Sequence, residues 1–239
     1  MKALDLFCGG GGTGEGLARA GFEVTGVDKA DHSRTYPHRF IRADAVEYGA
    51  EHGPEYDLIV AGPPCQNQIR ITAGNRARAG YRGDHHVNLI PATRTMLQAT
   101  GVPYVIENGP SDHLRPDVVL CGLMFGLPTL RDRYFELGGW FAPNPVHPTH
   151  RGHLTAGYRH GCRRTFDPSR CPKHDRWCRA TVYGVYGKGG GKPTVGEAQH
   201  ALGITWMEDI SVLNEAIPPV YAEYLGRWFG VWRSPHMKV

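Results

Sequence analysis

The sequence predicts an α/β protein built on a doubly wound, mostly parallel β-sheet. Short apolar runs typical of buried strands alternate along the chain with segments of helical composition. Several of these runs end in glycines or acidic residues, which is where doubly wound sheets bind their ligands. The 239 residues, 41% of them hydrophobic, are enough for one domain with a sizeable core.

Each element follows from a local pattern. The expected buried strands and the strands that complete the sheet cover 2–7, 22–28, 56–62, 102–108, 117–127 and 133–140, with a further short strand just before Asp44. The expected helices cover 16–21, 87–100, 195–204 and 220–230. Periodicity is lost from 138 to 194, a stretch rich in His, Pro, Gly and Arg. We therefore expect a main domain over 1–137, a small irregular region over 138–194, and helices over 195–232 that return to the main domain.

Composition and charge exclude few classes. The formal charge of +4 is only mildly basic and identifies no partner by itself. No stretch approaches the length of a membrane span, and the N-terminal sequence "MKALDLFCGG" leads directly into a strand pattern without a signal peptide. The expectation is a cytoplasmic protein without a membrane partner, with reduced cysteines.

A glycine-rich segment, "DLFCGGGGTGEG", connects the first strand to the first helix. Glycines at this place let the backbone approach a ligand, and an acid about twenty residues further on can accept two ribose hydroxyls. Gly9, Gly11, Glu15 and Asp28 are therefore candidates for a nucleoside-type cofactor, and Asp44 could reach an adenine amine. A dinucleotide, S-adenosylmethionine and a plain tight turn all remain open from this motif alone.

Two further motifs follow predicted strands. In "GPPCQNQ", two prolines stiffen the chain before Cys65, which suggests a thiol held for nucleophilic attack, whereas the alternative is a packed core cysteine. In "VIENG", Glu107 and Asn108 end a strand at the edge where ligands bind. The alternative for Glu107 is a strand-end cap or a surface carboxylate.

Together these motifs resemble the cytosine-C5 DNA methyltransferases. The glycine-rich strand end, "PPCQ", "ENG", "RDR" (131–133) and "EAIPP" (215–219) occur in the order of that family, over most of 1–137 and 195–230. The compact form resembles methylases carried by bacteriophages. The resemblance implies the S-adenosylmethionine-dependent methyltransferase fold, S-adenosylmethionine as cofactor and double-stranded DNA as partner. It also makes 1–137 the catalytic and cofactor-binding domain and 138–194 the target-recognition region.

The resemblance also implies a mechanism. The Cys65 thiolate would add to C6 of a flipped-out cytosine while Glu107 holds N3 and the exocyclic amine, and C5 would then take the methyl group. Arg133 would stabilise the activated ring or a nearby phosphate, with Arg131 supporting it. The cofactor-binding residues implied are Asp5, Phe7, Gly9, Gly11, Thr13, Gly14, Glu15, Asp28, Asp44, Pro63, Glu215 and Ala216.

The sequence departs from the family pattern in four places. Gly109 stands where the family usually has valine, Thr129 where it usually has glutamine, and Glu215 where it usually has asparagine. The recognition region is also short. Two other functions stay open: a cytosine-C5 methyltransferase that acts on RNA, and an inactive DNA-binding decoy with the same fold. A monomer in a bacterial or phage-infected cell is expected.

A cluster of cysteines lies in the irregular region. Cys162, Cys171, His174 and Cys178 could form a structural zinc site, and the alternative is three unrelated cysteines among basic loops. Further histidines could substitute as ligands: His147, His150, His153 and His160. The same region is expected to contact DNA through arginines, namely Arg151, Arg159, Arg163, Arg164, Arg170, Arg176 and Arg179.

Overall fold

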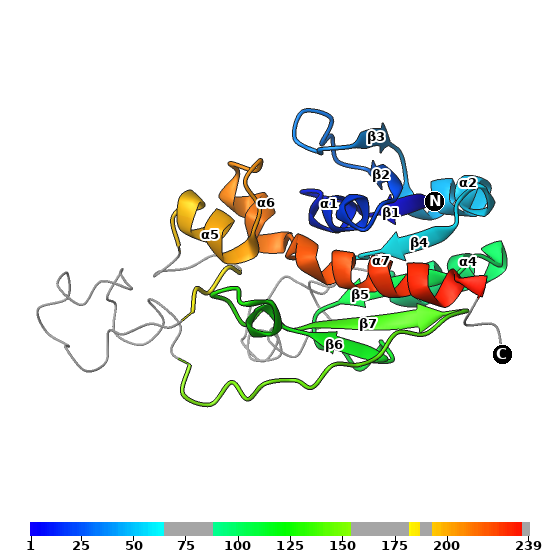
Figure 1. The fold of residues 1–239 in the computed structure, drawn as a ribbon. Helices are drawn as coiled ribbons and strands as arrows, with labels where there is room; N and C mark the ends of the chain where they lie inside the picture. The colour runs from blue at the N-terminus through cyan, green and yellow to red at the C-terminus, as the bar shows by residue number, and fades with distance from the viewer. Residues whose placement is uncertain (65–87, 154–181, 187–192, 236–239) are drawn as a thin grey trace, which may run out of the picture.

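The computed structural model describes residues 1–64, 88–153, 182–186 and 193–235, and within them it shows one seven-stranded sheet (Figure 1). The strand order is β3-β2-β1-β4-β5-β7-β6. The strands are β1 (Lys2–Leu6), β2 (Glu23–Asp28), β3 (Arg39–Arg42), β4 (Leu58–Ala61), β5 (Tyr104–Asn108), β6 (Val118–Leu120) and β7 (Arg133–Gly138). This architecture confirms the predicted α/β class and matches that of a methyltransferase fold.

Helices cover both faces of the sheet. They are α1 (Gly12–Arg19), α2 (Ala45–His52), α4 (Ile90–Thr100), α5 (Val195–Leu202), α6 (Ile210–Glu215) and α7 (Pro219–Arg233), with 3-10 turns η1 (Gly53–Glu55) and η4 (Gly122–Phe125). One hydrophobic core joins the sheet to α1 and α7, and a second joins its other face to α2 and α4. A third, smaller core lies between α5 and α6.

The alternating direction of side chains along each strand explains why both faces of the sheet have a hydrophobic core. Leu58 and Val60 of β4 are fully or nearly buried against the α1 and α7 side, whereas Ile59 between them is buried against the α2 and α4 side. Successive side chains of a strand point to opposite faces, so a strand covered on both sides needs an unbroken apolar sequence. The apolar runs that predicted the strands are therefore a direct result of this double cover.

One strand runs against the others, and this reversal shapes the site. Strands β1 to β5 pair in parallel, whereas β7 pairs antiparallel with both β5 and β6. The end of β5 therefore lies beside the beginning of β7, with Asn108 opposite Tyr134. Residues that follow "ENG" and residues of "RDR" consequently meet at one edge of the sheet.

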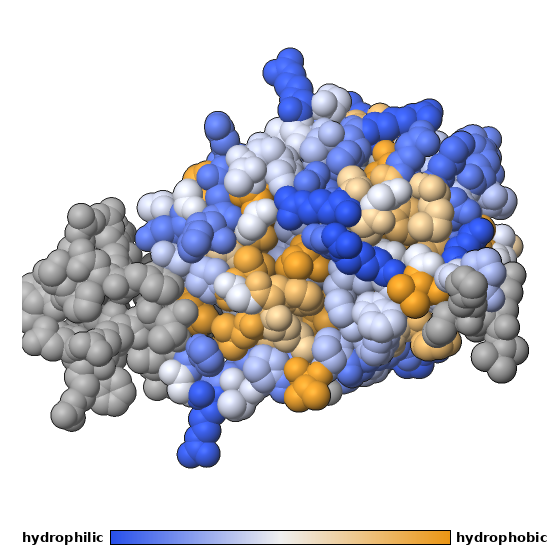
Figure 2. All heavy atoms as spheres, in the orientation of Figure 1, coloured by the Kyte–Doolittle hydropathy of each residue, from blue (hydrophilic) through white to orange (hydrophobic). Residues whose placement is uncertain are grey.

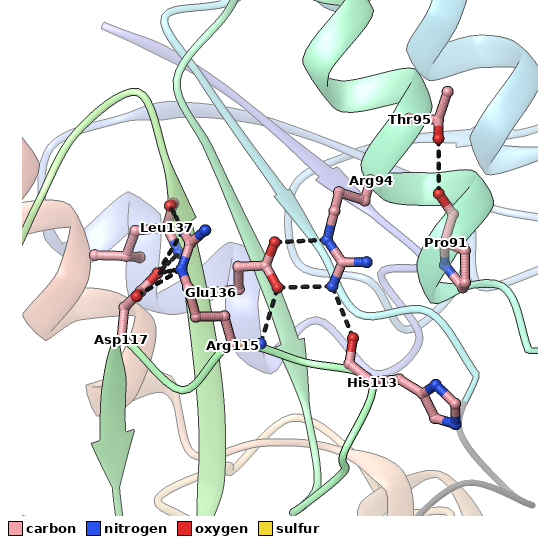
Figure 3. A network of polar contacts seen from close by, with 8 residues as sticks. All are labelled: Pro91, Arg94, Thr95, His113, Arg115, Asp117, Glu136 and Leu137. Carbon is pink, nitrogen blue, oxygen red and sulfur yellow. Dashed lines mark hydrogen bonds and ion pairs between the residues drawn. The ribbon is translucent and has the colours of Figure 1, made fainter.

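A network of ion pairs holds β7 in this place (Figure 3). Arg94 of α4 donates two hydrogen bonds of 2.7 Å to the buried carboxylate of Glu136, and a third to the His113 carbonyl. Arg115 adds its backbone N–H to Glu136 and pairs with Asp117, which accepts the Leu137 N–H. The bidentate pair lowers the pKa of Glu136 against the effect of burial, so the carboxylate stays charged and fixes β7 to α4.

The structure adds elements that periodicity did not predict. Helix α6 is too short to show a clear repeat, and residues 139–153 after β7 follow the surface without regular structure (Figure 1). Two side chains of this segment, Phe141 and Val146, are 62% and 95% exposed. Orange apolar side chains are scattered among blue hydrophilic ones on the face drawn in Figure 2. None of the described helices combines the length and apolarity that crossing a membrane would need.

Candidate active site

The loop after β1 has an unusual backbone. Phe7 adopts a φ of 59°, one of two positive φ angles at described non-glycine residues, and Gly9 has a φ of 46°. No atom lies within 4 Å of the place where a Cβ on Gly9 would stand. Gly9 therefore leaves open space at the carboxyl end of β1, as a backbone that must approach a ligand requires.

Asp28 ends β2 beside this space. Its two carboxylate oxygens accept the backbone N–H groups of Gly9, at 3.0 Å, and Ala30, at 2.9 Å. Each oxygen keeps a second acceptor position, and the side chain is 20% exposed. The structure thus holds Asp28 in one orientation at the edge of the sheet, where the sequence predicted a ribose contact.

Asp5 lies beneath the loop and supports it. Asp5 is only 2% exposed. Its carboxylate accepts a 3.0 Å hydrogen bond from the Tyr36 hydroxyl and another from the Gly14 N–H. Burial raises the pKa of Asp5 to about 7, although these two hydrogen bonds act in the opposite direction. Asp5 is therefore placed to support the predicted cofactor site from below, and a direct contact with the cofactor stays a prediction.

The other residues of the glycine segment serve mainly to bring helices together. A Cβ on Gly12 would lie 2.1 Å from the Ile217 carbonyl oxygen, and one on Gly11 would lie 2.6 Å from Pro37. The close approach of α1 to the start of α7 therefore requires glycine at position 12. Thr13 is partly buried, and Glu15 pairs with Arg19 at 2.8 Å.

The C-terminal motif lies against the same loop. Ala216, which ends α6 just after Glu215, has its Cβ 3.8 Å from a Cβ built on Gly10. Trp206, from the loop before α6, donates its indole N–H to the Gly10 carbonyl at 3.1 Å. The structure thus brings "EAIPP" to the glycine-rich loop, and contacts of Glu215 and Ala216 with a cofactor stay a prediction.

Asp44 has a structural role of its own. Its Oδ1 accepts the N–H groups of Val46, at 2.9 Å, and Glu47, at 3.2 Å, and so caps the N-terminus of α2. A contact with an adenine amine stays a prediction, and it would have to use the other carboxylate oxygen.

The segment that leads to Cys65 is fixed by its neighbours. Asn108, 2% exposed, donates from Nδ2 to the Pro63 carbonyl at 3.0 Å and accepts the Gly109 N–H on its Oδ1. A Cβ on Gly62 would lie 3.2 Å from Oε2 of Glu107, so the strand end passes directly beside that carboxylate. Cys65 lies outside the described residues, and its nucleophilic role stays a prediction.

Glu107 forms the polar centre of this edge. Its Oε1 lies 2.8 Å from Nε of Arg133, and the two side chains are 14% and 19% exposed. Burial raises the pKa of Glu107, while the nearby charges of Arg133 and Arg131 oppose that rise. The arrangement combines a carboxyl that readily holds a proton with a cation that can face a developing negative charge.

Arg131 is directed elsewhere. Its guanidinium donates to the carbonyl of Val185 and, at 2.9 Å, to that of Asn214, while the Tyr221 hydroxyl donates to its own carbonyl. Arg131 is the second described non-glycine residue with a positive φ, at 39°. It therefore links the start of β7 to α6, and its contact with substrate stays a prediction.

Several of these supporting residues were not predicted. Tyr36 packs against Gly26, where a Cβ would lie 2.3 Å from its ring, and an isolated glycine inside a strand is a signal of such close approach. Trp206 lies 196 residues from Gly10, and no local pattern marks their contact. The predicted zinc ligands Cys162, Cys171, His174 and Cys178 lie outside the described residues, as does most of the recognition region.

Replacing Asp5 by asparagine should change the pH dependence of stability. The folded state holds the Asp5 proton to about pH 7, whereas an unfolded aspartate loses it near pH 4. Asp5 thus stabilises the folded state most below about pH 4, and this contribution to the free energy of unfolding is lost as the pH rises toward 7. Between pH 5 and pH 8, the free energy of unfolding of Asp5→Asn should rise by about 2–3 kcal/mol relative to that of wild type. Urea unfolding at both values measures this gain.

A matched control is Asp31→Asn. Asp31 is an exposed carboxylate whose pKa is lowered by hydrogen bonds to Ser33, so it titrates below this pH range. The free energy of unfolding of Asp31→Asn should therefore change between pH 5 and pH 8 by the same amount as that of wild type. An equal pH response of Asp5→Asn and wild type would show that Asp5 ionises normally.

Known proteins resemble this chain most clearly in its N-terminal part. Residues 1–81 match the family described as C-5 cytosine-specific DNA methylase. The Type II methyltransferase M.HgiDI of Herpetosiphon aurantiacus is 28% identical over 164 residues, which are 58% of this chain and 52% of that protein. M.HindV of Haemophilus influenzae is 29% identical over 138 residues, covering 53% and 44%.

A third relative, M.FnuDI of Fusobacterium nucleatum, is 37% identical over 73 residues, 28% of this chain and 21% of that protein. The chain thus spans about half or less of the length of these relatives. The matched part contains the open glycine loop, Asp28 and the strand end that leads to Cys65. The fold and these matches agree that the chain is similar to the cytosine-C5 DNA methyltransferases, most clearly over residues 1–81.

Proposed function

We propose that the protein is a DNA cytosine-C5 methyltransferase that moves a methyl group from S-adenosylmethionine to a flipped-out cytosine through a Cys65–C6 adduct. One observation carries the proposal. Glu107, in its largely buried ion pair with Arg133, lies directly beside Gly62, three residues before Cys65. Attack on a pyrimidine ring requires a proton-holding carboxyl, a cation and a thiol. The first two lie beside the strand end from which the chain continues to Cys65.

The cofactor proposal rests on the open space at Gly9. Open space where a Cβ on Gly9 would stand, next to a carboxylate fixed at the end of β2, fits a nucleoside with a ribose diol. Asp28 would accept the ribose hydroxyls, and the loop from Phe7 to Gly11 would lie along the ligand. When bound, S-adenosylmethionine supplies an electrophilic methyl group.

The residues of the chain would carry the remaining chemistry. The Cys65 thiolate forms a bond to C6, and the displaced electron pair of the C5–C6 double bond moves into the ring. Glu107, whose pKa is raised by burial, donates a proton or hydrogen bond to N3. This stabilises the negative charge that develops on the ring. C5 becomes nucleophilic and gains the methyl group. Loss of the C5 proton to a base then returns electrons to the ring and expels the thiolate.

A base within duplex DNA cannot reach this edge while it is stacked. We propose that the target cytosine flips out of double-stranded DNA and that the region 138–194 holds the DNA and selects the site. Its arginines suit phosphate contacts, and a short region can specify only a short site. The relatives are named Type II methyltransferases, which favours a role in restriction–modification in the cytoplasm.

Bisulfite sequencing of plasmid DNA from cells that produce the protein tests the function. Protected cytosines should recur in one short sequence. Purified protein should also transfer labelled methyl to duplex DNA and not to tRNA. Transfer to tRNA alone would identify an RNA enzyme, and no transfer to either, with DNA binding retained, would identify an inactive binding protein.

Replacing Cys65 by serine should abolish turnover by about three orders of magnitude or more, because the hydroxyl is a far poorer nucleophile. Cofactor affinity should stay unchanged, since the thiol is needed for chemistry alone. Labelled methyl transfer and calorimetry measure the two effects. Activity within about tenfold of wild type would rule out the covalent mechanism.

Replacing Asp28 by alanine should weaken S-adenosylmethionine binding about 10- to 100-fold, the loss expected for a hydrogen bond to a charged group. Calorimetry measures it. Asp31→Ala, three residues further along an exposed loop, is the matched control and should bind like wild type. Unchanged affinity in Asp28→Ala would remove Asp28 from the cofactor site.

Replacing Asn108 by alanine should release the Pro63 carbonyl and let the Cys65 segment shift. A small misplacement of a nucleophile lowers the chemical rate strongly, so kcat should fall about 10- to 100-fold. Cofactor affinity should be unaffected. Single-turnover kinetics beside calorimetry distinguishes this from general loss of fold, which would reduce both, and an unchanged rate would contradict the positioning role.

A further inference from the structure

The chain that leaves β7 is anchored by Trp140, which is buried in the hydrophobic core, but none of residues 141–153 is buried. Between Gly139 and His153 it has no regular structure, and Val146 is almost fully exposed. The described hydrogen bonds along it include those from the Tyr224 hydroxyl to the Pro143 carbonyl and from the Val119 N–H to Asn144. This segment connects the sheet to the predicted recognition region, so its position matters for where that region begins.

Four potential metal ligands meet beside this segment. Cys121 follows β6, Asp132 lies between the two arginines of "RDR", and His147 and His150 come from the segment itself. One ligand atom from each of the four lies within 4.8 Å of every other. Among the described residues, this is the group of histidines, cysteines and acids that fits a metal ion.

The distances suit a tetrahedral ion. Nε2 of His150 lies 3.4 Å from Oδ1 of Asp132, and Nε2 of His147 lies 3.7 Å from the same oxygen. Zinc bonds of about 2.0–2.3 Å at tetrahedral angles separate ligand atoms by about 3.3–3.8 Å. These two contacts already have the required length, and the other ligand separations, none above 4.8 Å, would shorten when an ion binds.

Two of the atoms that face the centre of the cluster make no hydrogen bond. Asp132 Oδ1 and His150 Nε2 are both buried without a hydrogen bond, which is costly for polar atoms. His147 Nδ1 lies 2.9 Å from the Pro148 carbonyl, which can only accept, so Nδ1 must be the protonated nitrogen. In neutral His147, Nε2 then presents a lone pair toward Asp132, as in a metal-binding histidine.

The cysteine has the matching environment. Cys121 is fully buried, and its sulfur accepts the backbone N–H of Met124 at the start of η4. Hydrogen bonds of this kind stabilise a thiolate bound to a metal. One sulfur, two imidazole nitrogens and one carboxylate form a donor set suited to zinc.

We propose that Cys121, Asp132, His147 and His150 bind a structural zinc ion that fastens the segment after β7 to the start of that strand. Cys121 releases its thiol proton on binding, and the two histidines bind as neutral rings. Because Asp132 is flanked by Arg131 and Arg133, the ion also fixes the turn that delivers Arg133 to Glu107. His147 is the most exposed ligand and provides the route by which the ion enters.

This site is distinct from the zinc site predicted at Cys162, Cys171, His174 and Cys178. The two can be told apart because they share no ligand. Native mass spectrometry of the full chain with added Zn²⁺ counts the bound ions, and competition with a chromophoric chelator gives the affinity. Both measurements are independent of methyl transfer, so they remain informative whatever the enzymatic activity.

His147→Gln, at the exposed edge of the cluster, should bind one zinc ion fewer than wild type or bind it at least about 10- to 100-fold more weakly. Cys121→Ser should weaken zinc binding in the same way. When Co²⁺ replaces zinc, this variant should also lack the absorption band of a cobalt–thiolate bond at this site. The matched control, His153→Gln, lies in the same segment outside the cluster and should bind like wild type.

Circular dichroism of each variant separates loss of the ligand from loss of fold, and His147→Gln replaces an exposed residue. Equal zinc binding by wild type, His147→Gln and Cys121→Ser would overturn the proposal. So would wild-type protein that binds no zinc.

Discussion

The ion pair between Glu107 and Arg133 depends on the reversed direction of β7, and the rest of the site depends on that pair. In a fully parallel sheet the beginning of β7 would lie at the opposite edge from the end of β5. The antiparallel register instead brings the two side chains to 2.8 Å. The bidentate pair of Arg94 and Glu136 holds the same strand from its other side. One reversed strand thus converts two separate motifs into one centre.

The remaining parts of the edge follow from parallel pairing. Strands β1, β2, β4 and β5 end together, so Gly9, Asp28 and the Pro63 carbonyl lie at one side of the sheet. Hydrogen bonds fix these groups. The N–H groups of Gly9 and Ala30 donate to the Asp28 carboxylate, and Asn108 donates to the Pro63 carbonyl. Under the proposed function, the ends of β1 and β2 would bind the nucleoside, and the ends of β4 and β5 with the beginning of β7 would carry the chemistry.

Sequence predicted the strands because double burial demands unbroken apolar runs, and it singled out Asp28 and Glu107 because they end strands. Arg133 was implied only by the family resemblance of "RDR". Sequence did not predict Tyr36 or Trp206, whose contacts join residues far apart in the chain. Asn108 was visible only as part of "ENG", and its bond to Pro63 needs the parallel register of β4 and β5. The cluster around Asp132 also escaped prediction, because its ligands come from three segments without a spacing motif.

The central claim is that this frame aims Cys65 at C6 of a cytosine. DNA that carries 5-fluorocytosine in the methylated sequence tests it directly, because fluorine cannot leave as a proton does and the adduct should persist. With S-adenosylmethionine present, mass spectrometry of the digested complex should find the DNA joined to the peptide that contains Cys65. Absence of a covalent complex with protein that methylates ordinary DNA, or a bond to another residue, would contradict the account.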